Sequence, residues 1–504
     1  MWYNYRMLKM IRPSRARFLM AAQPQPLILS VPQPEADVFE LYRRIAAPGR
    51  PSFLFESGKG GGAVARWSFF GSDPYLELSG KGTRYELRTR DGSVVHKGDP
   101  FKALADVLRA SRIPRPDEAP PFIGGAVGYF GYDLIRQFEK LPNQATDDLR
   151  LPDVLFAFVD LFAAVDHHTK MLHLIYAPPL DRALGQPREK LYNEGCDRLT
   201  ELHARLLVRR KKGESDLRIG HLTVKPEQAR SDYVERARQC QEFIKSGDIY
   251  QANLSHRLTV DRDPGWPMEH FREHAGEALY SRVREVNPSP FGGLLAFDNM
   301  TLVSSSPERL VRLDGRRVDT RPIAGTRPRG HTPAEDRRLA EDLITNPKER
   351  AEHLMLVDLE RNDLGRVCKY GTVRADELMI VERYSHVSHI VSNVMGELRD
   401  GLDGFDLIKA VFPGGTITGV PKIRCMEILE GLEPVRRGPY TGSMGYLSWS
   451  GDLDLNIIIR TMLLVGGRGY LQVGAGIVAD SEPAREYEET LYKAEAFFKA
   501  LGEG

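Results

Sequence analysis

Cysteine is scarce in this chain, and its few positions are far apart. The spacing leaves no close Cys pair, which argues against a zinc site or a disulfide framework and is consistent with a reducing, cytoplasmic location. No cysteine lies in a Gly-x-Cys-x-Gly segment, so none has the sequence context of a nucleophile elbow. The four positions are Cys196, Cys240, Cys368 and Cys425.

The chain also lacks an excess of charge of one sign and a long apolar run. It has 70 Lys and Arg against 69 Asp and Glu, and this balance gives no reason to expect nucleic acid or an anionic membrane as a partner. No apolar stretch approaches the roughly 18 residues that cross a bilayer. The composition, 41% hydrophobic and 28% charged, is that of a globular protein, and 504 residues suffice for several domains.

The first twenty residues are basic and contain no acidic side chain. Their arginines interrupt the apolar stretch that a secretion signal would need. We therefore expect a disordered basic extension over residues 1–30, with Met20 as an alternative start. A transit peptide is the other interpretation.

A polar, basic stretch divides the rest of the chain. We expect a linker over residues 207–230, between an N-terminal region at 31–206 and a catalytic region at 231–504. Both regions contain short apolar runs bounded by Gly, Pro and Asp, together with amphipathic helical segments. Strands, hairpins and helices in this mixture predict an α+β fold rather than a doubly wound parallel sheet.

The C-terminal segment, residues 486–501, predicts a helix with two stripes. One stripe is apolar, and the other contains Glu486, Glu489 and Lys493 at offsets of 3 and 7. Such a row can offer carboxylates to a hard cation. An exposed Glu–Lys pair at i, i+4 has the same appearance, so the pattern alone leaves both interpretations open.

A second predicted helix begins at Asn346-Pro347, with proline at the first helical position. Glu349 and Glu352 share one of its faces. A magnesium ion takes one or two carboxylates, so one glutamate from each helix would suffice. Acidic residues near a helix N-terminus also follow from the helix dipole, and this pattern too is ambiguous by itself.

Other polar residues lie among apolar neighbours. Arg460 interrupts residues 456–465, which predict a strand buried on both faces, and a buried guanidinium needs either a protein carboxylate or an anionic substrate. The glycines of residues 474–476 would let a ligand approach the backbone. His389, in an apolar segment, is by itself more typical of a satisfied core histidine than of a catalyst.

Taken in order, these motifs resemble those of the chorismate-utilising enzymes, specifically the large subunits of anthranilate synthase and 4-amino-4-deoxychorismate synthase. The resemblance covers nearly all of residues 231–501 and is looser at residues 55–57 and 128–133. It implies packed antiparallel β-sheets flanked by helices. The matching segments are Asp-Ile-Tyr-Gln at 248–251, Ser-Pro-Glu at 306–308, Arg-Pro-Ile-Ala-Gly-Thr at 321–326, Glu-His-Leu-Met at 352–355, Phe-Pro-Gly-Gly-Thr at 412–416, Gly-Ala-Gly at 474–476 and Glu-Tyr-Glu-Glu-Thr at 486–490.

The resemblance implies a role for each group of site residues. Glu352 and Glu489 would hold Mg²⁺ on the ring carboxylate of chorismate, with Glu349 and Glu486 as supporting acids. Glu308 would protonate the departing ring hydroxyl. The residues that would bind the substrate are Gly325, Thr326, Thr416, Tyr440, Arg460, Gly474, Ala475, Gly476 and Lys493.

Three further positions bear on the reaction. Relatives that add water carry Lys where this chain has Gln251, and a neutral amide suits ammonia, so isochorismate and salicylate synthesis are not expected. Deoxychorismate enzymes often carry a nucleophilic Lys where this chain has Ala324, which favours anthranilate chemistry or direct amination. By resemblance, His389 would assist proton loss in anthranilate formation. Both the anthranilate and the deoxychorismate enzymes keep this histidine, so its presence does not distinguish the two products.

Other features favour 4-amino-4-deoxychorismate as the product: Gly414, residues 440–443 and residues 454–457. Tryptophan-inhibited enzymes typically carry Tyr-Met where this chain has Phe291-Gly292. We therefore expect 4-amino-4-deoxychorismate, with anthranilate as the alternative. A tryptophan site, if retained, would consist of Ser57, Pro290, Phe291 and Gly292.

The resemblance also implies the partners. Ammonia would come from glutamine through a glutamine amidotransferase subunit, since no cysteine here has a nucleophile-elbow context. The alternative from another functional class is a non-catalytic relative that only binds chorismate or tryptophan. The presence of Glu308, Glu352 and Glu489 argues against it.

Overall fold

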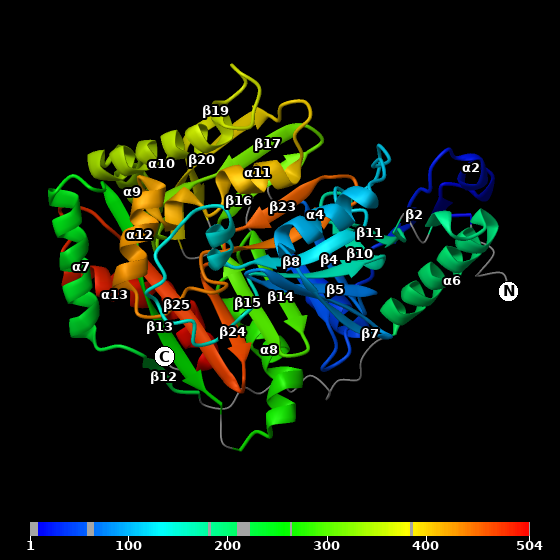
Figure 1. Ribbon diagram of the computed structural model, residues 1–504, viewed down its shortest axis with the longest axis horizontal. Coiled ribbons are helices and arrows are strands. Elements are labelled where there is room, and N and C mark those ends of the chain that lie inside the picture. Colours follow the sequence, from blue (N-terminus) through cyan, green and yellow to red (C-terminus); the bar gives the residue numbers. More distant parts are fainter. Residues whose placement is uncertain are drawn as a thin grey trace.

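Two large antiparallel β-sheets form the centre of the molecule, and helices lie around them (Figure 1). The computed structural model describes residues 9–57, 65–179, 183–208, 222–262, 265–383 and 387–502. Within these ranges, neighbouring strands of both sheets pair antiparallel. The predicted α+β fold with packed antiparallel sheets is confirmed.

The first sheet has 13 strands, and β21 pairs with β13 outside its main path. Its order is β1 (Ile11–Arg12), β2 (Leu27–Pro32), β11 (Met171–Tyr176), β10 (Leu161–Asp166), β4 (Trp67–Ser72), β3 (Ser52–Glu56), β14 (Phe291–Phe297), β15 (Met300–Ser306), β24 (Thr461–Val465), β25 (Arg468–Ile477), β13 (Gln251–Asp261) and β12 (Val224–Pro226), with β21 at Gly419–Val420.

The second sheet has 12 strands, and β19 pairs with β20 outside its main path. Its order is β18 (Ile323–Pro328), β20 (Val387–Glu397), β17 (Arg317–Arg321), β16 (Arg309–Asp314), β23 (Leu453–Asn456), β22 (Ser443–Ser448), β8 (Gly125–Phe130), β9 (Val154–Val159), β5 (Leu76–Lys81), β6 (Arg84–Thr89) and β7 (Gly92–Lys97), with β19 at Arg374–Arg383.

Helices cover both sheets. Those that position the site are α10 against β18 and β20, α13 against β25, and α7 against β13. None of the helices in the described ranges is long and apolar enough to span a membrane. The helices are α2 (Arg15–Met20), α3 (Val38–Ile45), α4 (Pro100–Ala110), η1 (Tyr132–Gln137), α6 (Arg188–Leu207), α7 (Arg230–Lys245), α8 (Met268–Val286), α9 (Pro333–Thr345), α10 (Pro347–Gly365), α11 (Gly404–Val411), η2 (Gly415–Ile417), α12 (Lys422–Leu432) and α13 (Pro483–Leu501).

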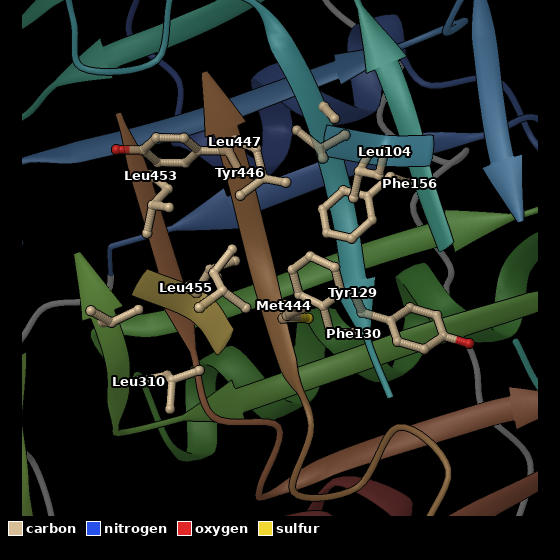
Figure 2. Close-up of a cluster of buried hydrophobic side chains, with 14 of the residues drawn as sticks. Leu104, Tyr129, Phe130, Phe156, Leu310, Met444, Tyr446, Leu447, Leu453 and Leu455 are labelled. Carbon is tan, nitrogen blue, oxygen red and sulfur yellow. The ribbon is translucent and has the colours of Figure 1, made fainter. Parts of the chain in front are cut away.

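The largest core joins strands from both ends of the chain. Every residue of β8, β9 and β22 is buried, so these strands read as nearly continuous apolar runs rather than alternating ones. Figure 2 shows Phe130 of β8 next to Phe156 of β9, in the same cluster as Met444 of β22 and Leu455 of β23. This core fixes β16 and β23, which lead into the site.

Both sheets mix the two predicted regions. In the first sheet β3 pairs with β14, and in the second β8 pairs with β22. The division predicted at residues 207–230 therefore does not separate two independent sheets. The part of that linker at residues 209–221 lies outside the described residues.

The predicted disordered extension over residues 1–30 is wrong for its described part, residues 9–30. Strand β1 pairs with β2, and Phe18 of α2 is buried with its ring 5.4 Å from that of Tyr192 on α6. The partners of these apolar side chains come from distant segments, so the local sequence gives no sign of them. Residues 1–8 lie outside the described ranges.

Candidate active site

Helix α10 begins where the sequence predicts. Asn346 accepts hydrogen bonds from the backbone N–H groups of Lys348 and Glu349, and Pro347 occupies the first turn. Further along the helix, Glu352 accepts a hydrogen bond of 3.1 Å from the amide nitrogen of Gln251 on β13. Burial raises the pKa of Glu352, and this hydrogen bond offsets part of the increase.

Helix α13 carries the second row of acids. Glu489 forms the predicted i, i+4 pair with Lys493 at 2.9 Å, and Lys493 also donates to the backbone carbonyl of Gly474 at 3.0 Å. Burial raises the pKa of Glu486, and the charge of Glu489 raises it further. The stripe therefore faces the glycine-containing strand β25.

Charged residues of the two helices affect the pKa values of Glu352 and Glu486. The charges of Glu349 and Glu489 add to the increase in the pKa of Glu352. The charge of Lys348 offsets part of the increase for both Glu352 and Glu486. In the part of the chain that the structure describes, no three or more His, Cys, Asp or Glu side chains are grouped so that they could hold a metal by themselves. Mg²⁺ needs only one or two carboxylates plus water and substrate oxygens, so the interacting pair Glu352 and Glu489 fits this ion.

Glu308 lies between β15 and β16 and is buried, with 5% of its surface exposed. Burial raises the pKa of Glu308 to about 7, although the Thr416 hydroxyl, the Ile323 N–H and the charges of Arg460 and Lys493 favour the ionised form. A carboxyl group with a pKa near neutrality can hold a proton and release it at physiological pH. This environment suits a general acid.

Arg460 is placed differently from the prediction. A single strand over residues 456–465 is wrong, because β23 ends in the second sheet and β24 begins in the first, with residues 457–460 connecting them. Arg460 adopts a positive φ of 47° at this crossing and is partly exposed rather than buried on both faces. Its charge lowers the pKa values of Glu308 and His389, so it lies beside both groups.

His389 on β20 lies opposite Thr326 on β18. Its Nδ1 is 3.0 Å from the Thr326 hydroxyl and 3.2 Å from the Gly325 carbonyl oxygen. Burial, helped by the charge of Arg460, lowers the pKa of His389 to about 4, so the ring is neutral at pH 7. A carbonyl oxygen only accepts hydrogen bonds, so Nδ1 carries the hydrogen and Nε2 is the basic nitrogen.

Strand β18 also brings Ala324 and Gly325 against α10. Gly325 has φ +64°, and a Cβ there would lie only 2.7 Å from a carboxylate oxygen of Glu349. Glycine is therefore required for the close approach of β18 to the acidic helix. Ala324 is buried and its methyl group offers no nucleophile.

The glycines of β25 lie under the side chains of β13. A Cβ at Gly474 would come within 2.6 Å of Asn253 Oδ1, and one at Gly476 within 2.6 Å of Gln251 Nε2. The two glycines thus leave room for the side chains of β13. The predicted contact of a ligand with this backbone stays a prediction. Asn253 was not singled out from the sequence, although it follows Gln251 at the period of two that places strand residues on one face.

Tyr440 is supported by a buried ion pair. Arg437 lies 5.7 Å from the centre of the Tyr440 ring and pairs with Glu433 at 2.7 Å, and it also donates to the backbone carbonyl of Asn253 at 2.6 Å. Burial raises the pKa of Tyr440, so the hydroxyl keeps its proton. Sequence reasoning also missed Arg437 and Glu433, because an i, i+4 pair usually indicates only an exposed contact.

A cavity of about 790 Å³ is lined in part by Arg309, the residue that follows Glu308. The Arg309 guanidinium lies 5.0 Å from the Phe291 ring centre and pairs with Asp454 at 2.8 Å. None of the predicted catalytic or metal-binding residues lines the cavity. Its lining includes all four positions of the predicted tryptophan site: Ser57, Pro290, Phe291 and Gly292.

The predicted site residues therefore occupy two places. The acids of α10 and α13, the buried acid Glu308, the imidazole, the guanidinium and the glycine strand form one connected group. Carboxylates near a guanidinium and an ammonium are groups that can bind a metal ion and an anionic substrate, so this group is the candidate active site.

Comparisons with known proteins identify that substrate class. The sequence matches the family described as chorismate binding enzyme over residues 50–499, and the chain belongs to this family. It is 42% identical over 458 residues to anthranilate synthase component 1 of Acetivibrio thermocellus, covering 90% of each chain. It is also 42% identical over 485 residues to aminodeoxychorismate synthase component 1 of Bacillus subtilis (strain 168), covering 95% of this chain and 98% of the relative.

A solved structure agrees with these relatives. Anthranilate synthase component I from Streptococcus pneumoniae TIGR4 superposes with a TM-score of 0.74 at 33% identity, covering 87% of this chain and 93% of that one. The protein is thus a chorismate-utilising enzyme of the anthranilate synthase or aminodeoxychorismate synthase component I type. The predicted family and fold are confirmed.

Proposed function

We propose that this enzyme converts chorismate and ammonia to 4-amino-4-deoxychorismate and water. The observation that carries the proposal is the buried Glu308, whose pKa of about 7 suits a proton donor. The neutral amide of Gln251, bonded to Glu352, supports ammonia as the nucleophile, since ammonia needs no base to activate it.

The charged residues of the site account for substrate binding. Chorismate is a dianion, and Arg460 and Lys493 supply positive charge beside Glu308. Glu352 and Glu489 would hold Mg²⁺, with Glu349 and Glu486 as supporting acids. When bound, the ion withdraws charge from the ring carboxylate as the ring system rearranges.

Glu308 begins and ends the proposed reaction in the same protonation state. It donates a proton to the ring hydroxyl, the C–O bond breaks and water leaves. The lone pair of ammonia forms the new C–N bond, and the resulting ammonium returns one proton to the Glu308 carboxylate. Because Ala324 offers no nucleophile, this amination proceeds directly, without a covalent enzyme intermediate.

The choice of product rests on segments around the cavity. Asp454 pairs with Arg309, and the Asn456 side chain donates to the backbone carbonyl of Phe291 at 3.2 Å. Residues 454–457 and Phe291-Gly292, which favour the deoxychorismate branch by resemblance, are therefore in mutual contact. Phe291-Gly292 offers an indole ring less contact than Tyr-Met, so we propose that tryptophan is not a strong inhibitor.

Anthranilate is the second candidate product. His389 favours it, because a neutral imidazole with a basic Nε2 can accept the ring proton that must leave when pyruvate is eliminated. Ala324 is also compatible with anthranilate chemistry.

Ammonia is proposed to come from a glutamine amidotransferase subunit. The relatives are named as component 1, which implies a second component. All four cysteines of this chain are buried, and burial raises the pKa values of Cys196, Cys240, Cys368 and Cys425. Such thiols are poor nucleophiles.

A product assay tests the proposal. The purified chain is incubated with chorismate, magnesium chloride and an ammonium salt, with and without an added 4-amino-4-deoxychorismate lyase, and the fluorescent products are separated and identified by mass. We expect 4-aminobenzoate only when the lyase is added. Anthranilate formed without the lyase would replace the proposed product by the second candidate.

A further inference from the structure

Two carboxamide groups on β13, one of them bonded to Glu352, have buried oxygen atoms that meet no hydrogen-bond partner among the described residues. The oxygens are Oε1 of Gln251 and Oδ1 of Asn253, and both atoms are buried. Gln251 as a whole is only 7% exposed. A buried acceptor that meets no donor is destabilising, so its presence in a site points to a ligand that donates.

The orientation of each carboxamide is fixed by the partner of its nitrogen. The Gln251 nitrogen donates to the Glu352 carboxylate at 3.1 Å, and the Asn253 nitrogen donates to the backbone carbonyl of Thr416 at 3.3 Å. Both partners only accept, so turning either amide around would place two acceptors together. The two oxygens therefore remain without a donor.

The two carboxamide groups lie between the acids proposed to bind magnesium and the proposed proton donor Glu308. Gln251 and Asn253 share one face of β13 and lie over Gly476 and Gly474 of β25. Gln251 reaches Glu352 at one end, and Asn253 reaches Thr416, whose hydroxyl lies beside Glu308, at the other.

We infer that Gln251 and Asn253 form an ammonia-binding subsite, in which their two amide oxygens accept hydrogen bonds from the nucleophile. This inference rests on the proposed amination and assigns Asn253 as the positioning residue that nothing else identifies. Ammonia has three N–H groups and one lone pair, so two N–H groups held by acceptors leave the lone pair directed toward the substrate. The substrate carboxylates are unsuitable occupants, because a carboxylate oxygen would meet another acceptor.

The variant Asn253→Leu tests the subsite, since leucine has nearly the shape of asparagine without its polar atoms. Thr259→Val is the matched control, because it removes a polar group from the same strand at a point where Thr259 only donates to the Lys225 carbonyl. Initial rates are measured with ammonium chloride as the only nitrogen source and without an amidotransferase, varying ammonia and chorismate separately. Thermal unfolding of each variant is followed in parallel.

Loss of one hydrogen bond predicts a rise of about three- to tenfold in the KM for ammonia in Asn253→Leu, while the KM for chorismate and the unfolding midpoint stay close to those of the unmodified enzyme. Thr259→Val should change neither KM. A rise confined to the KM for chorismate would mean that Asn253 holds a substrate hydroxyl, and it would overturn the subsite.

These measurements test the ammonia-binding subsite independently of the identity of the product. Formation of anthranilate would overturn the proposed product, yet the KM for ammonia would still decide the role of Asn253. If the variant uses ammonia with an unchanged KM, the subsite is wrong and the amination stands. If the unmodified enzyme shows no ammonia-dependent turnover, both are wrong.

Discussion

At the scale of single residues, the protonation of Glu308 controls the proposed chemistry. Glu308→Gln keeps the size of the side chain and removes its proton, so we expect kcat to fall about a hundred- to ten-thousandfold. Binding of chorismate, measured by calorimetry, should persist because Glu308 does not carry the charges that hold a dianion. An unchanged kcat would exclude Glu308 as the acid.

The same residue predicts a pH dependence. The acid must be protonated, and burial raises the pKa of Glu308 to about 7, so kcat/KM for chorismate, measured at a constant concentration of unprotonated ammonia, should decline tenfold per pH unit above that value. Glu360→Gln is the matched control: Glu360 is also buried, its pKa is raised to about 8, and it accepts a hydrogen bond from Thr320 that glutamine can replace. The control should keep both the rate and the alkaline decline.

Single residues also show what the sequence can indicate and what it cannot. Glu308 lies in the Ser-Pro-Glu segment at 306–308, and the resemblance assigns roles to it and to His389, whose apolar segment alone indicates only a core residue. Asn253 and Arg437 have no such motif, and their importance comes from contacts across β13, β25 and η2 that depend on tertiary structure. The environment that raises the pKa of Glu308 also comes from several elements and has no local signal.

At the scale of elements, Glu352 of α10 and Glu489 of α13 form the proposed magnesium site. Replacing Glu489 by Gln removes one carboxylate from α13, so the magnesium concentration for half-maximal rate should rise by more than about tenfold. A second readout avoids activity: with chorismate present, magnesium should raise the unfolding midpoint of the unmodified enzyme more than that of the variant.

Glu488→Gln is the control for that experiment. Glu488 precedes Glu489 on α13 and is similarly exposed, but it pairs with Arg230 at 3.2 Å rather than with Lys493. Its replacement removes the same charge from the same helix and should leave the magnesium dependence unchanged. Equal behaviour of the two variants would contradict a metal site between α10 and α13.

Elements with strong local signals were the ones that could be predicted. Asn346-Pro347 marks the start of α10, and the hairpin of β24 and β25 follows the glycines at residues 466–469. The segment 456–465 was misread because its apolar residues cross from one buried sheet to the other. The hydrophobicity of a segment indicates that it is buried, but it does not indicate which of the two sheets each residue belongs to.

At the scale of the whole molecule, the catalytic half depends on the N-terminal half for its sheets. A fragment of residues 222–504 would expose the edge of β14 that pairs with β3 and the edge of β22 that pairs with β8. We expect this fragment to aggregate or to lack a cooperative thermal transition, as measured by light scattering and circular dichroism. Co-expression with residues 9–208 should restore a soluble, cooperative complex, whereas a stable lone fragment would contradict this dependence.

The same interdependence explains why the fold class was predictable but the division into regions was not. Alternating apolar runs and turn residues predict antiparallel strands locally. The pairing of β8 with β22 joins residues more than three hundred positions apart, and no local pattern encodes it. The buried positions of Ile11 and Phe18 escaped prediction for the same reason.

The pairing of β8 with β22 has a consequence during synthesis. Ribosomes add about 5 to 20 residues per second, so roughly 15 to 60 seconds pass between the emergence of β8 and that of its neighbour. Throughout that interval the nascent chain presents an apolar, hydrogen-bonding edge with no partner of its own. Folding of this enzyme in the cell should therefore depend on chaperones that shield that edge until residues 443–448 have left the exit tunnel.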